Sequence, residues 1–166
     1  MSARILLPSE RHERYPIQMG GPLNEINDCR SLFLADVQEM GHNSLKLVVS
    51  EGLPVGQPES ISVGGVAISD CTRIEVSDQS RVFELVWTSY VGYAVLNESF
   101  ASVADDEQYE GSRFRIYSKS RFLDYMSEAT FACDEHPGPT RHYCVACEDH
   151  IVEVLAVNGP VVRRIQ

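Results

Sequence analysis

Apolar residues recur at every second position in several short runs along the chain. Leu45, Leu47 and Val49 follow this spacing over 45–50, and Phe83, Leu85 and Trp87 follow it over 81–87. A period of two is typical of strands that bury one face of a sheet. Further strands are expected at 73–77, 90–96, 113–118, 142–147, 151–157 and 161–165.

Turn signals separate these runs at short intervals. Gly64-Gly65 lies between 60–63 and 66–69, and Asn158-Gly159 lies between 151–157 and 161–165. Both dipeptides readily adopt the positive φ angles of two-residue hairpin turns. The glycines and prolines of 52–60 predict a loop, and Pro160 places the last strand at a sheet edge.

Two interpretations of 28–41 remain open. A helix would have Asn27 or Asp28 as its N-cap and would stop at Gly41. A strand would instead join 45–50 through the turn-like segment 41–44, and we slightly favour this hairpin.

One short helix is expected after the strand at 113–118. Ser118 or Ser120 can cap its N-terminus, and it would run to about Ala129. Phe122 and Met126 would belong to its apolar stripe.

Together these elements predict a mainly β fold, either an antiparallel β-sandwich or an open barrel with one short helix. Eight to ten short strands joined by turns favour this class over alternating strands and helices. We expect a single β-rich domain, 1–166, in which 1–24 form an irregular N-terminal arm with one short strand at 4–7. No glycine-rich phosphate loop follows a strand, so nucleotide-binding folds have no support.

Charge narrows the range of partners. The chain has 24 acidic and 14 basic side chains, a net charge of −10. Such a surface repels the phosphates of nucleic acids and anionic membranes, whereas it attracts basic proteins. If the chain has a macromolecular partner, we therefore expect a protein, and a basic one is favoured.

The cysteines indicate a reducing compartment. There are five, an odd number, and a chain of 166 residues is long enough to fold without disulfides. The apolar run Ile5-Leu6-Leu7 is far too short for the core of a signal peptide, and no stretch reaches the length of a membrane span. The sequence thus predicts a cytoplasmic protein with free thiols.

Six possible soft-metal ligands fall between 133 and 150, which raises the possibility of a zinc site. Zinc favours four cysteine or histidine ligands, and the spacing of Cys144 and Cys147 occurs in zinc knuckles. However, residues three apart in a regular strand point to opposite faces, so the favoured alternative makes these two cysteines small core residues. The candidate ligands are Cys133, His136, His142, Cys144, Cys147 and His150.

A cysteine hydrolase is a weaker alternative. Cys133 would be its nucleophile, with His136 or His142 as the base and Asp134 or Glu135 as the orienting group.

An acidic loop and a basic strand stand next to each other in the sequence. Arg113, Arg115 and Tyr117 would share one face of a strand, opposite Phe114 and Ile116. This face could bind an anionic group, but pairing with the neighbouring acidic loop is favoured. The candidate binding residues are Asp105, Asp106, Glu107, Glu110, Arg113, Arg115 and Tyr117.

Several stretches resemble small uncharacterised bacterial proteins. They are 83–87, 97–100, 110–125, 134–139 and 142–143. The resemblance brings no activity and no catalytic residues. Small acidic bacterial proteins of this size include the immunity proteins that neutralise toxins, which offers an analogy for the function.

The leading functional hypothesis is a non-catalytic, acidic binding module that contacts another protein. It follows from the net charge together with the lack of a convincing catalytic motif. A zinc-binding protein and a cysteine hydrolase are the alternatives. No cofactor is expected unless the zinc site forms.

Overall fold

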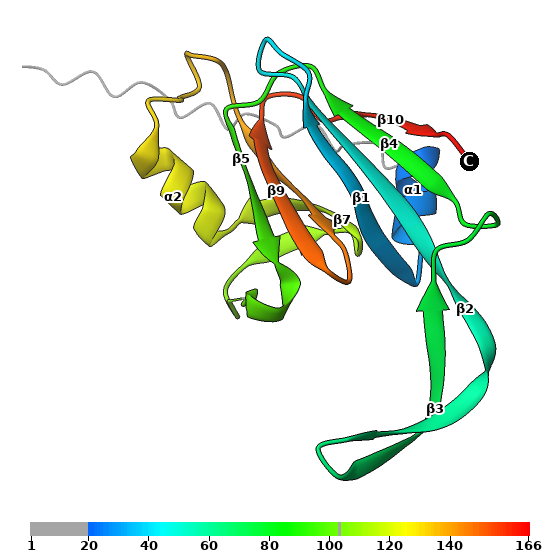
Figure 1. Cartoon of the computed structure of the whole chain (residues 1–166). Coiled ribbons are helices and arrows are strands. Elements are labelled where there is room, and N and C mark those ends of the chain that lie inside the picture. Colours follow the sequence, from blue (N-terminus) through cyan, green and yellow to red (C-terminus); the bar gives the residue numbers. More distant parts are fainter. Residues whose placement is uncertain (1–19, 103) are drawn as a thin grey trace, which may run out of the picture.

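The computed structural model describes residues 20–102 and 104–166 as two packed antiparallel sheets (Figure 1). The expected fold class is confirmed, in the form of a sandwich and not of a closed barrel. No helix in the described part of the chain is long and apolar enough to span a membrane. The strand expected at 4–7 lies outside the described residues, and so does most of the irregular N-terminal segment expected at 1–24.

The first sheet has the strand order β1-β2-β4-β10, and β3 pairs with the far half of β2. Its strands are β1 (Ser31–Glu39), β2 (Leu45–Val63), β3 (Val66–Glu75), β4 (Val82–Trp87) and β10 (Val161–Arg164).

The second sheet has the order β5-β9-β8-β7-β6. Its strands are β5 (Gly92–Asn97), β6 (Gln108–Glu110), β7 (Phe114–Lys119), β8 (Arg141–Ala146) and β9 (His150–Ala156). The described residues also form α1 (Pro22–Asn27), a 3₁₀ turn η1 (Glu98–Phe100) and α2 (Arg121–Ala129).

The core lies between the two sheets and uses the alternation seen in the sequence. On the first sheet Leu45, Leu47 and Val49 are fully buried. They face the inner residues of the second sheet, among which Tyr143 lies with its ring 6.1 Å from that of Trp87 on the first sheet. Burial of these aliphatic and aromatic side chains is the main driving force for closing the sandwich.

The segment 28–41 forms a strand, so the favoured hairpin is confirmed and the helix is wrong. Glu39 pairs with Leu45, and the turn between them has positive φ at Gly41, His42 and Asn43. Glycine and asparagine tolerate this conformation better than other residues. Asn27 is not an N-cap but the last residue of α1. This helix begins at Pro22, within the N-terminal segment 1–24 that was expected to be irregular.

The prediction of a loop at 52–60 is wrong, because β2 continues through these residues to Val63. Two shifts of register against β3, between Val55 and Glu59 and between Glu59 and Ile61, accommodate its glycine and prolines. Bulges of this kind let a strand pass over residues that break a regular ladder. The hairpin turn at Gly64-Gly65 is confirmed, with positive φ at both residues.

Beyond Gly52, β2 leaves the sandwich together with β3 and projects away from it as a free two-stranded hairpin (Figure 1). We call residues 54–74 the arm. Every residue from 54 to 70 is exposed. The base of the arm is tightly packed, since a side chain at Gly52 would meet Phe33 and Ile74, each at 2.6 Å.

Candidate functional site

The six cysteines and histidines between 133 and 150 do not surround one point. Cys133 and His136 are exposed in a loop, and Cys147 packs in the core between the sheets. Cys144 lies on the other face of its sheet, between Arg115 and Glu153 on the neighbouring strands. Within the described ranges, no three histidine, cysteine or acidic residues come close enough to hold a metal ion.

The buried thiols behave as core residues. Cys144 and Cys147 are almost fully buried, and burial raises the pKa of each thiol to about 12. A thiol with so high a pKa is neither a nucleophile nor a ready metal ligand at neutral pH. Both cysteines are thus buried, but only Cys147 packs in the core between the sheets.

The contacts of Cys133 do not match those of a catalytic cysteine. Its hydrogen bond to the Glu135 side chain lowers the pKa of that carboxyl, and the His136 ring stacks on Phe131 at 6.1 Å. His142 is buried and has a serine as its partner. The hydrogen-bond partner of the thiol is thus a carboxylate, whose negative charge disfavours the thiolate, whereas a cysteine nucleophile is activated by a histidine or another cationic neighbour.

The acidic loop and the basic strand contact each other within the chain. Lys119 Nζ lies 2.6 Å from Asp106 Oδ2, and this hydrogen bond lowers the pKa of the aspartate. Arg115 stacks over the ring of Tyr109 at 4.8 Å. The favoured interpretation, pairing between the loop and the strand, is confirmed for Lys119 and Asp106.

The other candidate binding residues are placed as follows. Arg113 contacts Glu148 at 2.7 Å and the Arg30 carbonyl, Tyr117 is buried, and Glu107 accepts a hydrogen bond from the Arg121 backbone. Only Asp105 and Glu110 stand exposed without a contact that defines a site.

A polar cluster on the outer face of the second sheet joins Ser120, His142 and Glu153. Ser120 Oγ accepts a hydrogen bond from the Leu123 backbone N–H at the start of α2 and shares a second hydrogen bond with His142 Nδ1, 2.8 Å away. His142 Nε2 makes no hydrogen bond and lies 4.0 Å from Glu153 Oε1. The His142 ring stacks on Tyr117 with centroids 4.5 Å apart.

Burial shifts the two titratable groups of this cluster in opposite directions. It lowers the pKa of His142 to about 4, so the ring is neutral at physiological pH. Together with the negative charge of Glu107, which contributes less, burial raises the pKa of Glu153 to about 7. A group that titrates near neutrality can exchange a proton, but Ser120 is buried and caps a helix, so the cluster has no accessible nucleophile.

Two members of this cluster were not among the candidate site residues. The sequence indicates Ser120 only as a helix cap, and it indicates no role for Glu153. One sequence feature could have indicated Glu153: it is the one charged residue within the apolar run 151–157.

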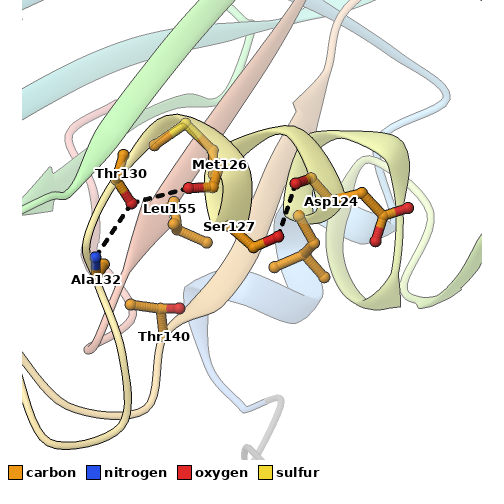
Figure 2. A pocket seen from close by; sticks show the side chains of 8 residues that line it. Asp124, Met126, Ser127, Thr130, Ala132, Thr140 and Leu155 are labelled. Carbon is orange, nitrogen blue, oxygen red and sulfur yellow. Dashed lines mark hydrogen bonds between the residues drawn. The ribbon is translucent and has the colours of Figure 1, made fainter.

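A small hollow lies beside this cluster, between α2 and the second sheet (Figure 2). Its volume is about 260 Å³. Two of its hydroxyl groups are already occupied, since Thr130 Oγ1 donates to the Met126 carbonyl and accepts from the Ala132 N–H, and Ser127 donates to the Asp124 carbonyl. The Asp124 carboxylate and the Thr140 hydroxyl are the other polar side-chain groups that line it. The hollow therefore offers few free groups to hold a polar ligand.

The arm carries a group of adjacent exposed apolar side chains. Ile61 pairs with Ile68 and Val63 pairs with Val66, so all four side chains share one face. Their exposed fractions are 41, 46, 59 and 64% for Ile61, Ile68, Val63 and Val66. We call these four residues the apolar face of the arm.

No charged residue lies between Glu59 and Asp70, and the opposite face of the arm carries Ser62 and Ala67. The sequence predicted the hairpin at the tip but not that it stands free of the sandwich. Apolar patches left in water commonly mark interaction sites.

No protein-family model, curated protein or solved structure matches this chain.

Proposed function

We propose that this protein is a binding module that holds another protein through its arm and performs no chemistry of its own. The apolar face of the arm is the observation that carries this proposal. The core of the sandwich does not include Ile61, Val63, Val66 or Ile68. Covering these side chains with another surface would stabilise the complex by about 25 cal/mol per Å² of apolar area buried.

The charges around the arm indicate the chemistry of the partner. Glu59 and Asp70 flank the apolar face, and the chain as a whole carries a charge of −10. A complementary surface has an apolar cleft with cationic groups at its rim. The same charges disfavour nucleic acid, which would present phosphates to the arm.

The remaining sites support binding over catalysis. The thiols of Cys144 and Cys147 are buried, and Cys133 contacts a carboxylate. The cluster of Ser120, His142 and Glu153 has no accessible nucleophile, and its histidine is neutral.

A matched pair of variants tests the proposal. In the arm variant, Ile61, Val63, Val66 and Ile68 are each changed to Ser; in the control, Ser62→Thr and Ala67→Ser alter only the opposite face. Both variants and the wild type are cross-linked in lysate of the native host, and the captured proteins are quantified by mass spectrometry. We expect the wild type and the control to capture the same protein, and the arm variant to lose it at least tenfold.

Equal capture by all three proteins would refute the proposal. A second measurement separates proteins from lipids, because an apolar hairpin can also enter a bilayer. If the wild type, but not the arm variant, floats with vesicles of phosphatidylcholine and phosphatidylglycerol, the arm is a membrane element and the proposal is wrong.

A further inference from the structure

We infer that the partner of the arm is a second copy of this chain. The inference rests on the proposed function, because it names the protein that the arm holds. The outer face of the first sheet carries a surface with the chemistry that the arm requires, an apolar hollow with cations beside it.

This surface, which we call the groove, is a hollow of about 290 Å³. One row of paired residues crosses it, from Lys46 on β2 through Val86 on β4 to Val161 on β10. Val161 and Met40, which line the groove from opposite edges of the sheet, are 53 and 45% exposed. The groove therefore combines an open apolar floor with a lysine at one side.

The groove is less acidic than the rest of the molecular surface, which suits an arm that carries acidic residues. Lys46 and Arg163 line it, and Glu84, the cross-strand partner of Arg163, is its only acidic lining residue. Lys46 Nζ also lies 3.9 Å from Asp36 Oδ2 on β1. These two cations and two anions balance locally, whereas the whole chain has a charge of −10, so Glu59 and Asp70 of another copy meet less repulsion on this face than on an average part of the surface.

The arm cannot reach the groove of its own molecule. Lys46 lies near the start of β2 and the tip of the arm follows its last residue, Val63. At ~3.3 Å per residue of strand, these points are roughly 50 Å apart. The contact therefore joins two molecules, and because it pairs two different surfaces, it is head-to-tail and extends into a ring or a chain.

We expect a weak and reversible association. The tip of a hairpin covers much less area than the ~1,200 Å² or more that stable interfaces bury. Repulsion between two chains of charge −10 also opposes contact, although salt screens it beyond about 8 Å at physiological ionic strength.

Two blocked variants provide the test. The arm variant described above removes the apolar face, and the groove variant carries Lys46→Glu and Val161→Glu. Sedimentation velocity over a wide concentration range should show the wild type associating and each variant remaining monomeric. An equimolar mixture should form dimers, because it supplies one intact groove and one intact arm.

The groove variant on its own separates this inference from a contact between two arms. If the arms pair with each other, the groove variant associates like the wild type, which overturns the inference. A charge exchange is a second test: Lys46→Glu alone should weaken association at least tenfold, and adding Glu59→Lys should restore it. A Lys119→Glu variant, on the second sheet, serves as the control and should associate normally.

The two proposals can fail separately. A wild type that is monomeric at every concentration overturns the second copy as partner. If the arm variant still loses a captured host protein, the proposed binding function stands; if it loses nothing, both proposals fall.

Discussion

At the scale of single residues, His142 and Glu153 lie 4.0 Å apart in one buried environment that shifts their pKa values in opposite directions. Burial disfavours the charged form of each group. The folded protein therefore holds a proton on Glu153 between pH 4.5 and 7 that the unfolded chain loses, so this contribution to stability is lost as the pH rises. His142 acts oppositely, and its contribution is lost as the pH falls from 6.5 to 4.

Replacing either residue should remove its own pH-dependent contribution to stability. For Glu153→Gln, we expect the free energy of unfolding, variant minus wild type, to increase by about 3 kcal/mol from pH 4.5 to 7, at ~1.4 kcal/mol per pKa unit. For His142→Gln, the same difference should decrease by about 3 kcal/mol from pH 4 to 6.5. Urea denaturation across this pH range measures both, and a constant difference would contradict the opposed shifts.

The cysteines should differ sharply in reactivity. In the folded protein, we expect iodoacetamide at mildly alkaline pH to label the exposed Cys133 first, while the buried Cys29, Cys144 and Cys147 stay unlabelled. The pKa of each buried thiol is raised, to about 11 for Cys29 and about 12 for the others. Peptide mapping by mass spectrometry measures the rates, and labelling of Cys144 as fast as Cys133 would refute this assignment.

The environment of a residue can be predicted from the sequence when its neighbours along the chain determine that environment. The burial of Cys144 and Cys147 follows from their place in an apolar run, and Ser120 was already one of two candidate caps for the helix. The position of Glu153 beside His142 depends on the register of β8 against β9, which pairs Glu153 with Cys144. Such a register is not visible in either segment alone.

At the scale of elements, Asn27 fastens α1 to β7. Its side-chain oxygen accepts hydrogen bonds from the backbone N–H groups of Ser112, Arg113 and Phe114, at 3.0, 3.0 and 2.9 Å. These donors precede and begin β7, so one side chain sets the position of the strand against the helix.

Removing this acceptor should destabilise the protein. We expect Asn27→Ala to lower the free energy of unfolding by about 2 kcal/mol, since several backbone donors lose their partner. Asn27→Asp keeps an acceptor oxygen in place and should cost clearly less. Urea denaturation of the two variants decides the matter, and equal losses would show that the oxygen is not the cause.

Strand β2 shows where local patterns mislead. Its first six residues were predicted as a strand, but Gly52, Pro54, Gly56 and Pro58 indicated a loop. The ladder with β3 continues nevertheless, because two register shifts absorb the irregular residues. Pairing with a neighbouring strand can thus override the preference of single residues.

At the scale of the whole molecule, the sandwich and the arm are separate structures that share one strand. The two-sheet class could be predicted because alternation and turns recur along most of the chain. The free arm could not, because whether a hairpin packs on a core or projects from it depends on contacts between segments distant in sequence.

The sandwich should therefore fold without the arm. Replacing 56–72 by Asn-Gly joins Val55 to Arg73, which are paired in the native hairpin. We expect this shortened protein to unfold within about 1 kcal/mol of the wild type, because exposed residues contribute little to stability. Chemical denaturation measures the change, and a shortened protein that is unfolded would show that the arm supports the core.

The shared strand also determines how the molecule carries a mechanical load. Inside the sandwich, β2 lies between β1 and β4 and is hydrogen-bonded to both. A pull on the arm tip along β2 acts parallel to this strand, so it shears both ladders at once instead of peeling their bonds apart one by one. A cargo attached at the tip would thus be tethered to one of the strands best anchored against extraction.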